Sequence, residues 1–208
     1  MQNERMIRVT GHGELRIKPD VVHLTLTLER TDADYAEAVA AAEEATKMAK
    51  EALLKAGVGE TEMRALSLRT QPRYETVTDE NGVRTRKFTG YSAVRRMRAE
   101  LGADPAVLGS VIAALAASGA APETAAEYDL KDGEALREKL IALAVKDARR
   151  RAKTMAKAAD VRLGAVLSME TGSSTPIVRA AALRMDGAEL QPEEIVLTED
   201  VRMIYAIE

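Results

Sequence analysis

Two segments in which alanine recurs every three or four residues constrain this fold more than any other feature. The first begins after Thr31-Asp32-Ala33-Asp34, whose side chains can cap a helix, and ends before Gly57, a left-handed terminator. Its apolar positions are Tyr35, Ala38, Ala42, Ala45, Ala49, Ala52 and Ala56. Because alanine is small, such a helix can lie very close to its neighbour. The spacing predicts a helix packed on the chain's own sheet, with an intermolecular coiled coil as the alternative.

The second alanine-rich segment, from about Glu134 to Ala159, predicts another long helix. Its inward positions recur every four residues and again allow close packing: Leu140, Ala144, Ala148, Ala152 and Ala156. Between the two long helices, Asp104-Pro105 is a helix N-cap followed by a first-turn proline. This pair predicts a shorter third helix that ends near Gly119.

Alternating residues predict two half-buried strands near the start of the chain. Ile7 to Ile17 places Gly11 and Gly13 on its apolar face, and Val22 to Leu28 follows the same period. Lys18-Pro19-Asp20 lies between them as a turn signal, so the two strands are expected to form a hairpin. Glycine inside a strand indicates a bulge or the close approach of another backbone, here a helix with an alanine face.

A second hairpin is predicted where Asn81-Gly82 separates two largely polar arms. It should project as an arm of about residues 73–90, and a two-residue loop would place Asp79 opposite Arg84. The candidate interface residues on this arm are Arg73, Tyr74, Glu75, Arg84, Arg86 and Phe88.

The last part of the chain predicts one strand, a long loop and a final strand. Val161 to Glu170 reads as the first strand, and about residues 171–194 lack a clear period, which is typical of irregular or interfacial loops. Val201 to Ile207 is expected to be buried on both faces. The whole pattern predicts one α+β domain over residues 1–208, with antiparallel sheets packed against two long alanine-rich helices and one short helix.

Composition excludes several classes of function. The chain has no cysteine or tryptophan and one phenylalanine, so thiol chemistry is absent and the core must be aliphatic. A formal net charge of -3 from mixed charges gives no broad basic surface for nucleic acid. No stretch approaches the roughly 20 apolar residues that span a bilayer, so we expect a soluble protein without membrane insertion. The first residues lack a signal-peptide pattern, which predicts a cytoplasmic location, or an extracytoplasmic one if a leader has been removed.

Short motifs in order along the chain resemble the SIMPL-domain family. They are the Val9-Thr10-Gly11-His12-Gly13 strand, the Pro19-Asp20 turn, the Gly90-Tyr91 strand start, and Leu163-Gly164-Ala165-Val166 after a late helix. The resemblance covers almost the whole chain. It implies an α+β fold, frequent assembly into ring-like or channel-like oligomers, a mostly extracytoplasmic location, and a loose link to oxidative-stress or envelope physiology. It brings no established catalytic residues.

No catalytic, cofactor-binding or metal-binding residues are assigned from the pattern. His12 and His23 would lie roughly 13 Å apart on the predicted hairpin, too far for one subunit to bind a single ion between them. Arg95 shares a strand face with apolar residues and should need a partner. The alternatives are a twist or bulge of the strand, a side chain that reaches solvent at a sheet edge, a buried structural ion pair and, last, a catalytic role.

We therefore expect a non-enzymatic protein that assembles with copies of itself. The alternative is a module that binds a small ligand or a peptide at an intersubunit pocket or sheet edge. A hydrolase is the third hypothesis, and it would need a serine or carboxylate beside a histidine in a concave site.

Overall fold

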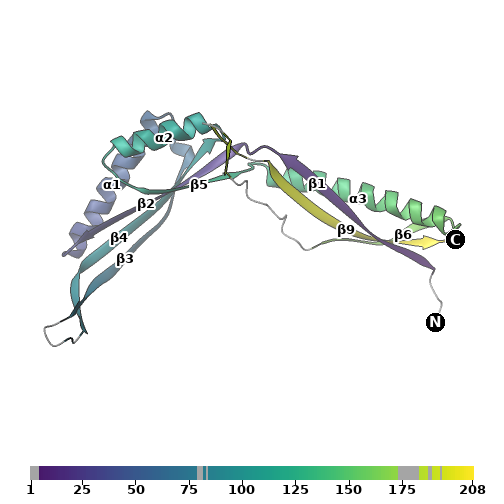
Figure 1. The fold of residues 1–208 in the computed structure, drawn as a ribbon, viewed down its shortest axis with the longest axis horizontal. Coiled ribbons are helices and arrows are strands. Elements are labelled where there is room, and N and C mark those ends of the chain that lie inside the picture. Colours follow the sequence, from purple (N-terminus) through teal and green to yellow (C-terminus); the bar gives the residue numbers. More distant parts are fainter. Residues whose placement is uncertain (1–4, 79–81, 83, 173–182, 187–188, 193) are drawn as a thin grey trace. The chain divides into compact units, whose positions relative to one another are not determined.

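A computed structural model describes residues 5–78, 82, 84–172, 183–186, 189–192 and 194–208 of the protein (Figure 1). The chain divides into two compact units, Asp20–Asp129 and Met1–Pro19 with Leu130–Glu208. Both units combine helices with antiparallel sheets, which confirms the predicted α+β class. That they act as one domain stays a prediction.

The unit Asp20–Asp129 is a four-stranded antiparallel sheet covered by two helices. Its elements are β2 (Val21–Asp32), α1 (Tyr35–Lys55), a 3₁₀ turn (Glu60–Glu62), β3 (Met63–Thr78), β4 (Arg84–Gly102), α2 (Pro105–Ala117) and β5 (Glu123–Asp129). The strand order β3-β4-β2-β5 gives the β-α-β-β-α-β arrangement of ferredoxin-like folds. Figure 1 shows both helices on one face of this sheet.

Local sequence signals explain both helices of this unit. Asp34 and Asp104 are the N-caps, and each side chain accepts a hydrogen bond from a backbone amide of the first turn. Gly57 follows α1 with a φ of +91°, which favours glycine. The buried stripe of α1 packs against β2, whose Leu24, Leu26 and Leu28 are fully buried. The predicted helix bounds and the buried alanine stripe of α1 are confirmed here. Tyr35, predicted as the first position of that stripe, is instead 51% exposed.

The second unit is a three-stranded sheet covered by one long helix. Its elements are β1 (Met6–Ile17), α3 (Gly133–Ala158), β6 (Leu163–Thr171), β7 (Leu183–Asp186), β8 (Glu189–Pro192) and β9 (Ile195–Ile207). The order β1-β9-β6 places β9 at the centre, antiparallel to both neighbours. Figure 1 shows α3 running along β1 and β9.

Glycines in β1 allow α3 to lie against its backbone. A Cβ atom at Gly11 would overlap the carbonyl oxygen of Ala144 and lie 2.6 Å from Ala148 Cβ. A Cβ atom at Gly13 would overlap the carbonyl oxygen of Leu140. The expected close approach between the alanine-faced helix and these glycines is therefore confirmed.

The predicted hairpin of the first two strands is wrong. β1 pairs with β9 from Met6 opposite Ala206 to Ile17 opposite Ile195, whereas β2 pairs with β4 and β5. Lys18-Pro19-Asp20 thus connects strands of two different sheets. The estimated separation of His12 and His23 depended on that hairpin and no longer applies.

Two predictions near the C-terminus need correction. β9 is buried mainly on one face, since Val201 and Met203 are buried while Arg202 between them is exposed, so it is not buried on both faces. Part of the expected loop of residues 171–194 is regular, because β7 and β8 form a hairpin with Asp186 opposite Glu189. Residues 173–182, 187–188 and 193 of that loop lie outside the described residues.

Candidate interaction surface

Four aromatic residues form a continuous row at the base and along the side of the β3–β4 hairpin. The ring centroids of Tyr74 and Phe88 are 5.7 Å apart, and those of Phe88 and Tyr91 are 5.3 Å apart. Tyr91 then contacts Tyr35 of α1 at 5.4 Å. All three pairs meet edge to face, which is the favourable geometry for such rings. We call these four residues the aromatic row.

A β-bulge aligns the aromatic row. In the β3–β4 ladder Arg73 lies opposite Gly90 but Tyr74 lies opposite Phe88, so Thr89 is an extra residue in β4. Residues 88 and 91 would lie on opposite faces of a regular strand, and one extra residue brings them to the same face. Gly90 has a φ of +132°, and a Cβ there would overlap the carbonyl oxygen of Asp32. The Gly90-Tyr91 motif therefore sets the geometry of the row.

The row is exposed in a chain that has few aromatic residues. Five tyrosines and one phenylalanine are all the aromatic residues of its 208 positions. Tyr35, Tyr74 and Phe88 are 51%, 48% and 45% exposed, although aromatic side chains gain most from burial. Exposed aromatic clusters of this kind mark interaction surfaces.

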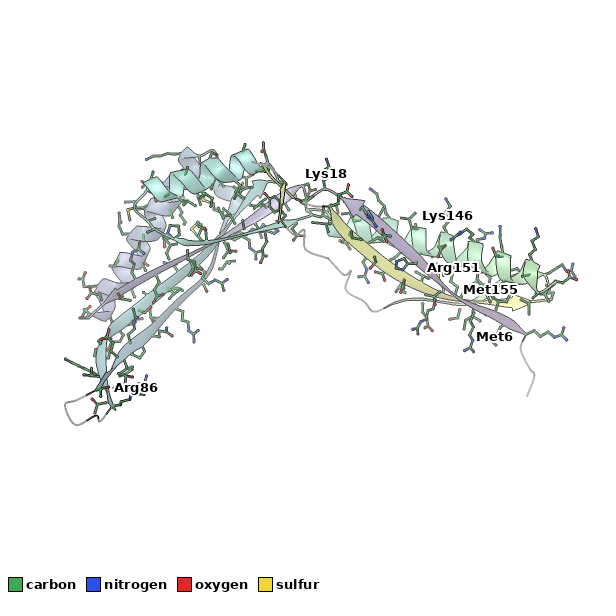
Figure 2. The ribbon with its side chains drawn as sticks, viewed as in Figure 1. Met6, Lys18, Arg86, Lys146, Arg151 and Met155 are labelled. Carbon is green, nitrogen blue, oxygen red and sulfur yellow. The ribbon has the colours of Figure 1, made fainter. Side chains whose placement is uncertain are left out.

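The other arm residues surround the row with charge. The guanidinium carbon of Arg86 lies 4.9 Å from the centre of the Tyr74 ring, a cation–π contact, and Figure 2 shows Arg86 near the far end of the hairpin. Arg73, Glu75 and Arg84 are exposed on the same two strands. Arg84 lies opposite Thr78, one residue away from the predicted pairing. The six candidate interface residues thus share one arm, while Tyr35 and Tyr91 were not predicted as part of the surface.

Arg95 lies in β4, where its side chain is 28% exposed and forms an ion pair with Glu43 of α1 at 3.0 Å. The Arg95 Nε has no hydrogen-bond partner within the described residues. Arg95 thus links the helix to the sheet and takes no part in the aromatic row.

The remaining motif residues, Pro19, Asp20 and Gly164, make contacts that hold strands in place. Pro19 is buried next to the start of β2, and the Asp20 amide donates to the carbonyl of Asp129. At Gly164 of β6, a Cβ atom would lie 3.1 Å from the carbonyl oxygen of Ala206 in β9.

Both histidines contact carboxylates. His12 Nδ1 lies 2.6 Å from Asp200 Oδ1, and His23 Nε2 lies 3.6 Å from Asp129 Oδ2. Within the described residues, no three histidine, aspartate or glutamate side chains gather closely enough to hold a metal ion. No helix in the described part of the chain is long and apolar enough to cross a membrane.

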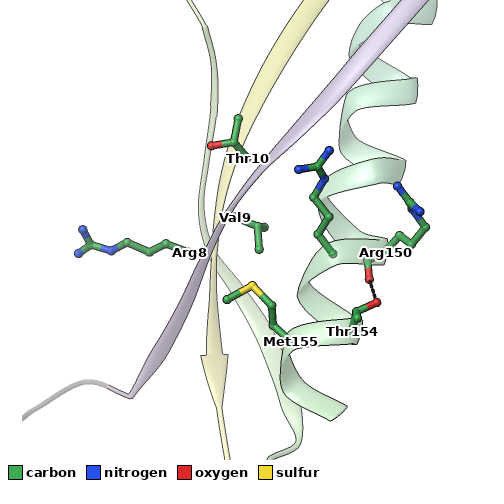
Figure 3. A pocket seen from close by; sticks show the side chains of 7 residues that line it. Arg8, Val9, Thr10, Arg150, Thr154 and Met155 are labelled. Atoms are coloured by element: carbon green, nitrogen blue, oxygen red, sulfur yellow. Dashed lines mark hydrogen bonds between the residues drawn. The ribbon is translucent and has the colours of Figure 1, made fainter. Parts of the chain in front are cut away.

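A second surface feature is a groove of about 580 Å³ between β1 and α3. Figure 3 shows Val9 and Met155 facing each other inside the groove, with Arg8 pointing away from the helix. The lining residues are Arg8, Val9, Thr10, Arg150, Arg151, Thr154 and Met155.

Asp147 organises the charges at one end of this groove. It accepts hydrogen bonds from Arg150, from Arg151 Nε at 2.6 Å and from the backbone amide of His12 at 3.0 Å. The Arg150 bond, then the His12 amide and then Arg151 lower the pKa of Asp147 from its ordinary 3.8 to about 2, against the opposite effect of burial.

The lowered pKa of Asp147 predicts a defined pH dependence of stability. Its contribution should be complete above pH 3.8, the ordinary value, and should be lost as the pH falls through about 2, its value in the fold. Thermal unfolding of the wild type and of Asp147→Asn should differ most near pH 5, and the difference should shrink toward pH 2. A difference that stays constant over this range would contradict the assignment.

The fold and its exposed arm define a class of α+β proteins in which helices cover antiparallel sheets. The chain belongs to the SIMPL family, described as a protein of unknown function (DUF541), whose sequence model matches residues 7–205. This match includes both compact units.

Two relatives are similar over much of their length. They are the 26 kDa periplasmic immunogenic proteins of Brucella melitensis biotype 1 (strain ATCC 23456 / CCUG 17765 / NCTC 10094 / 16M) and Brucella abortus (strain S19). Each is 28% identical over 171 residues, which cover 82% of this chain and 68% of the relative. The solved structure of CutA from Synechococcus elongatus PCC7942 matches 62% of this chain and 96% of its own at 15% identity. Its TM-score of 0.27 is too low to support an argument.

Proposed function

We propose that this chain is a non-enzymatic protein that assembles with copies of itself, and that the β3–β4 arm makes the contact. The exposed aromatic row carries this proposal. Tyrosine and phenylalanine are enriched in the buried centres of protein interfaces, where a few such side chains supply most of the binding energy. In a chain with six such residues, the exposure of Tyr35, Tyr74 and Phe88 is best explained by burial against another molecule.

The neighbouring strand supports the same surface. Among the strands that the structure describes, β3 lies at the edge of its sheet, and its Leu66 and Leu68 are 46% and 45% exposed. Unpaired backbone groups beside exposed apolar side chains favour pairing with another strand. An identical arm offers a matching edge and matching rings, as symmetric self-association requires.

The absence of catalysis is part of the proposal. Each histidine ring contacts a carboxylate, which is one part of what the hydrolase hypothesis requires, but neither histidine lines the groove between β1 and α3, so the concave site that the hypothesis also requires is not met there. We also propose an extracytoplasmic location with a role in envelope or stress physiology. The names of the two relatives, which include the word periplasmic, support that location. No comparison supports the cytoplasmic expectation.

The test is the solution mass of the full chain, measured by light scattering after size exclusion over a dilution series. The wild type should be a multimer, and Tyr74→Ser with Phe88→Ser should shift it to the monomer without lowering its thermal midpoint. The matched control is Leu54→Ser with Leu143→Ser, which removes two side chains of 43% and 38% exposure on the helices α1 and α3, neither of which is part of the arm. A monomeric wild type, or an arm variant that keeps the multimer, would overturn the proposal.

A further inference from the structure

The free edge of β1 faces the groove beside α3. Among the described strands, β1 pairs with β9 alone, so its other edge is unpaired. The Ile207 amide of β9 donates a hydrogen bond to the carbonyl of Arg5. The backbone amides and carbonyls of the odd-numbered residues in β1 therefore point toward β9. The His12 amide donates instead to Asp147 on the helix side. Because backbone groups alternate in an antiparallel strand, the amides and carbonyls of Arg8 and Thr10 point to the free edge.

Asp147 shows which chemical group this edge accepts. Its carboxylate receives the edge amide of His12 and hydrogen bonds from Arg150 and Arg151 at once. The Arg150 and Arg151 side chains are nevertheless 75% and 53% exposed. A guanidinium has five N–H donors, so each arginine keeps donors for a second carboxylate.

The rest of the groove fits an extended chain. Its floor is the free backbone edge at residues 8–10, and its wall is the α3 surface at residues 150–155. Met155 is 48% exposed and offers an apolar contact next to the arginines. A strand laid along β1 would direct every second side chain toward this wall.

We propose that the β1 edge binds an extended acidic peptide segment of a partner protein, which adds as a strand beside residues 8–10 and places a carboxylate on Arg150 and Arg151. The backbone ladder supplies affinity that does not depend on sequence, and the two arginines supply the preference for acidic side chains. This surface belongs to the unit that contains β1 and α3, whereas the arm belongs to the other unit.

The probe is a fluorescein-labelled peptide of eight residues that alternates valine and threonine around two aspartates, measured by fluorescence anisotropy with the full chain. Replacing its aspartates by asparagine should weaken binding about 10-fold, which corresponds to about 1.4 kcal/mol. The protein variant Arg150→Gln with Arg151→Gln should lose a similar factor. Raising the salt concentration should weaken the aspartate peptide more than the asparagine peptide.

Proline at residue 10 separates strand addition from simple charge attraction. Thr10→Pro removes an amide that points away from β9, so the β1–β9 ladder keeps its hydrogen bonds while the added strand loses one. Binding should fall at least about 10-fold. Thr10→Ala keeps the amide and should bind within about twofold of the wild type.

Amide exchange in the wild type provides a second measurement if Thr10→Pro fails to fold. The peptide should slow the exchange of the Arg8 and Thr10 amides. Unchanged exchange with the bound peptide, equal affinity for both peptides, or no binding would overturn the proposal. A mass change of the unliganded protein in Thr10→Pro would also overturn it, because the edge would then bind a second copy.

Discussion

Replacing Gly11 by alanine is expected to cost about 3 kcal/mol or more of the free energy of unfolding. The new Cβ would overlap the carbonyl oxygen of Ala144 and crowd Ala148, so both contacts lie on the α3 helix itself. Overpacking costs about 1–3 kcal/mol when flexible side chains can move aside, and a helix backbone yields less easily. Chemical denaturation followed by circular dichroism should show the loss as a lower midpoint.

Gly133→Ala is the matched control for this experiment. It makes the same substitution at the first residue of α3, where nothing lies within 4 Å of the added Cβ. Because alanine is the better helix former, stability should stay the same or rise by up to about 1 kcal/mol. If Gly11→Ala and Gly133→Ala had the same midpoint, α3 would not lie against β1 as described.

The buried Glu199 leads to the second large prediction. Replacing Glu199 and replacing its ion-pair partner Arg137 are expected to change the stability of the fold in opposite directions. Its side chain is fully buried on the core face of β9, where its ion-pair partner among the described residues is Arg137, whose Nε lies 3.7 Å from Glu199 Oε2. Arg137→Met should lower stability by about 1–3 kcal/mol, because it leaves a buried carboxylate without its cation. Glu199→Leu should raise stability by about 1–4 kcal/mol, since a leucine there would extend the face of Leu197 and Val201.

Thermal and chemical unfolding of both single variants and of the double variant measure how much each member of the Arg137–Glu199 pair contributes to stability. In the double variant, the loss caused by Arg137→Met should disappear, because no carboxylate remains to be stranded. A destabilised Glu199→Leu variant would show that the carboxylate makes favourable contacts beyond this ion pair.

The sequence predicts well what nearby residues decide. Asp34 marks the start of α1 and Gly57 marks its end, and both could be read from the sequence because capping involves only the adjacent turn. The two glycines of β1 indicated a close neighbour because few other causes place glycine within an alternating strand. In each case the physical reason lies within a few residues of the signal.

Pairing between distant segments was harder to predict. Lys18-Pro19-Asp20 has the composition of a hairpin turn, but β1 gains more from pairing with β9, where Met6 lies opposite Ala206. No local pattern encodes a contact across almost the whole chain. The alternation of Val201, Arg202 and Met203 did contain the signal for a half-buried strand, but the apolar residues at the end of the chain concealed it.

The arm was predictable from Asn81-Gly82, but the aromatic row was only partly so. Tyr74 and Phe88 lie on the two arms and were recognised as interface candidates. Tyr91 joins them because of the bulge at Thr89, and a regular strand would have placed it on the other face. Gly90 lies between Phe88 and Tyr91 in a chain with few aromatic residues. That glycine is the sequence signal from which the place of Tyr91 in the aromatic row could have been predicted.

The pairing of the first strand with the last one also sets an order of events during synthesis. Residues 20–129 are continuous in sequence, so all strands of their sheet are synthesised before α3. β1 is translated before residues 20–129, whereas β9, which occupies the centre of its sheet, is translated after them and after α3. The nascent chain must therefore hold β1 as an unpaired, alternating strand until β9 has been made, and an unpaired strand of this kind is open to pairing with other chains.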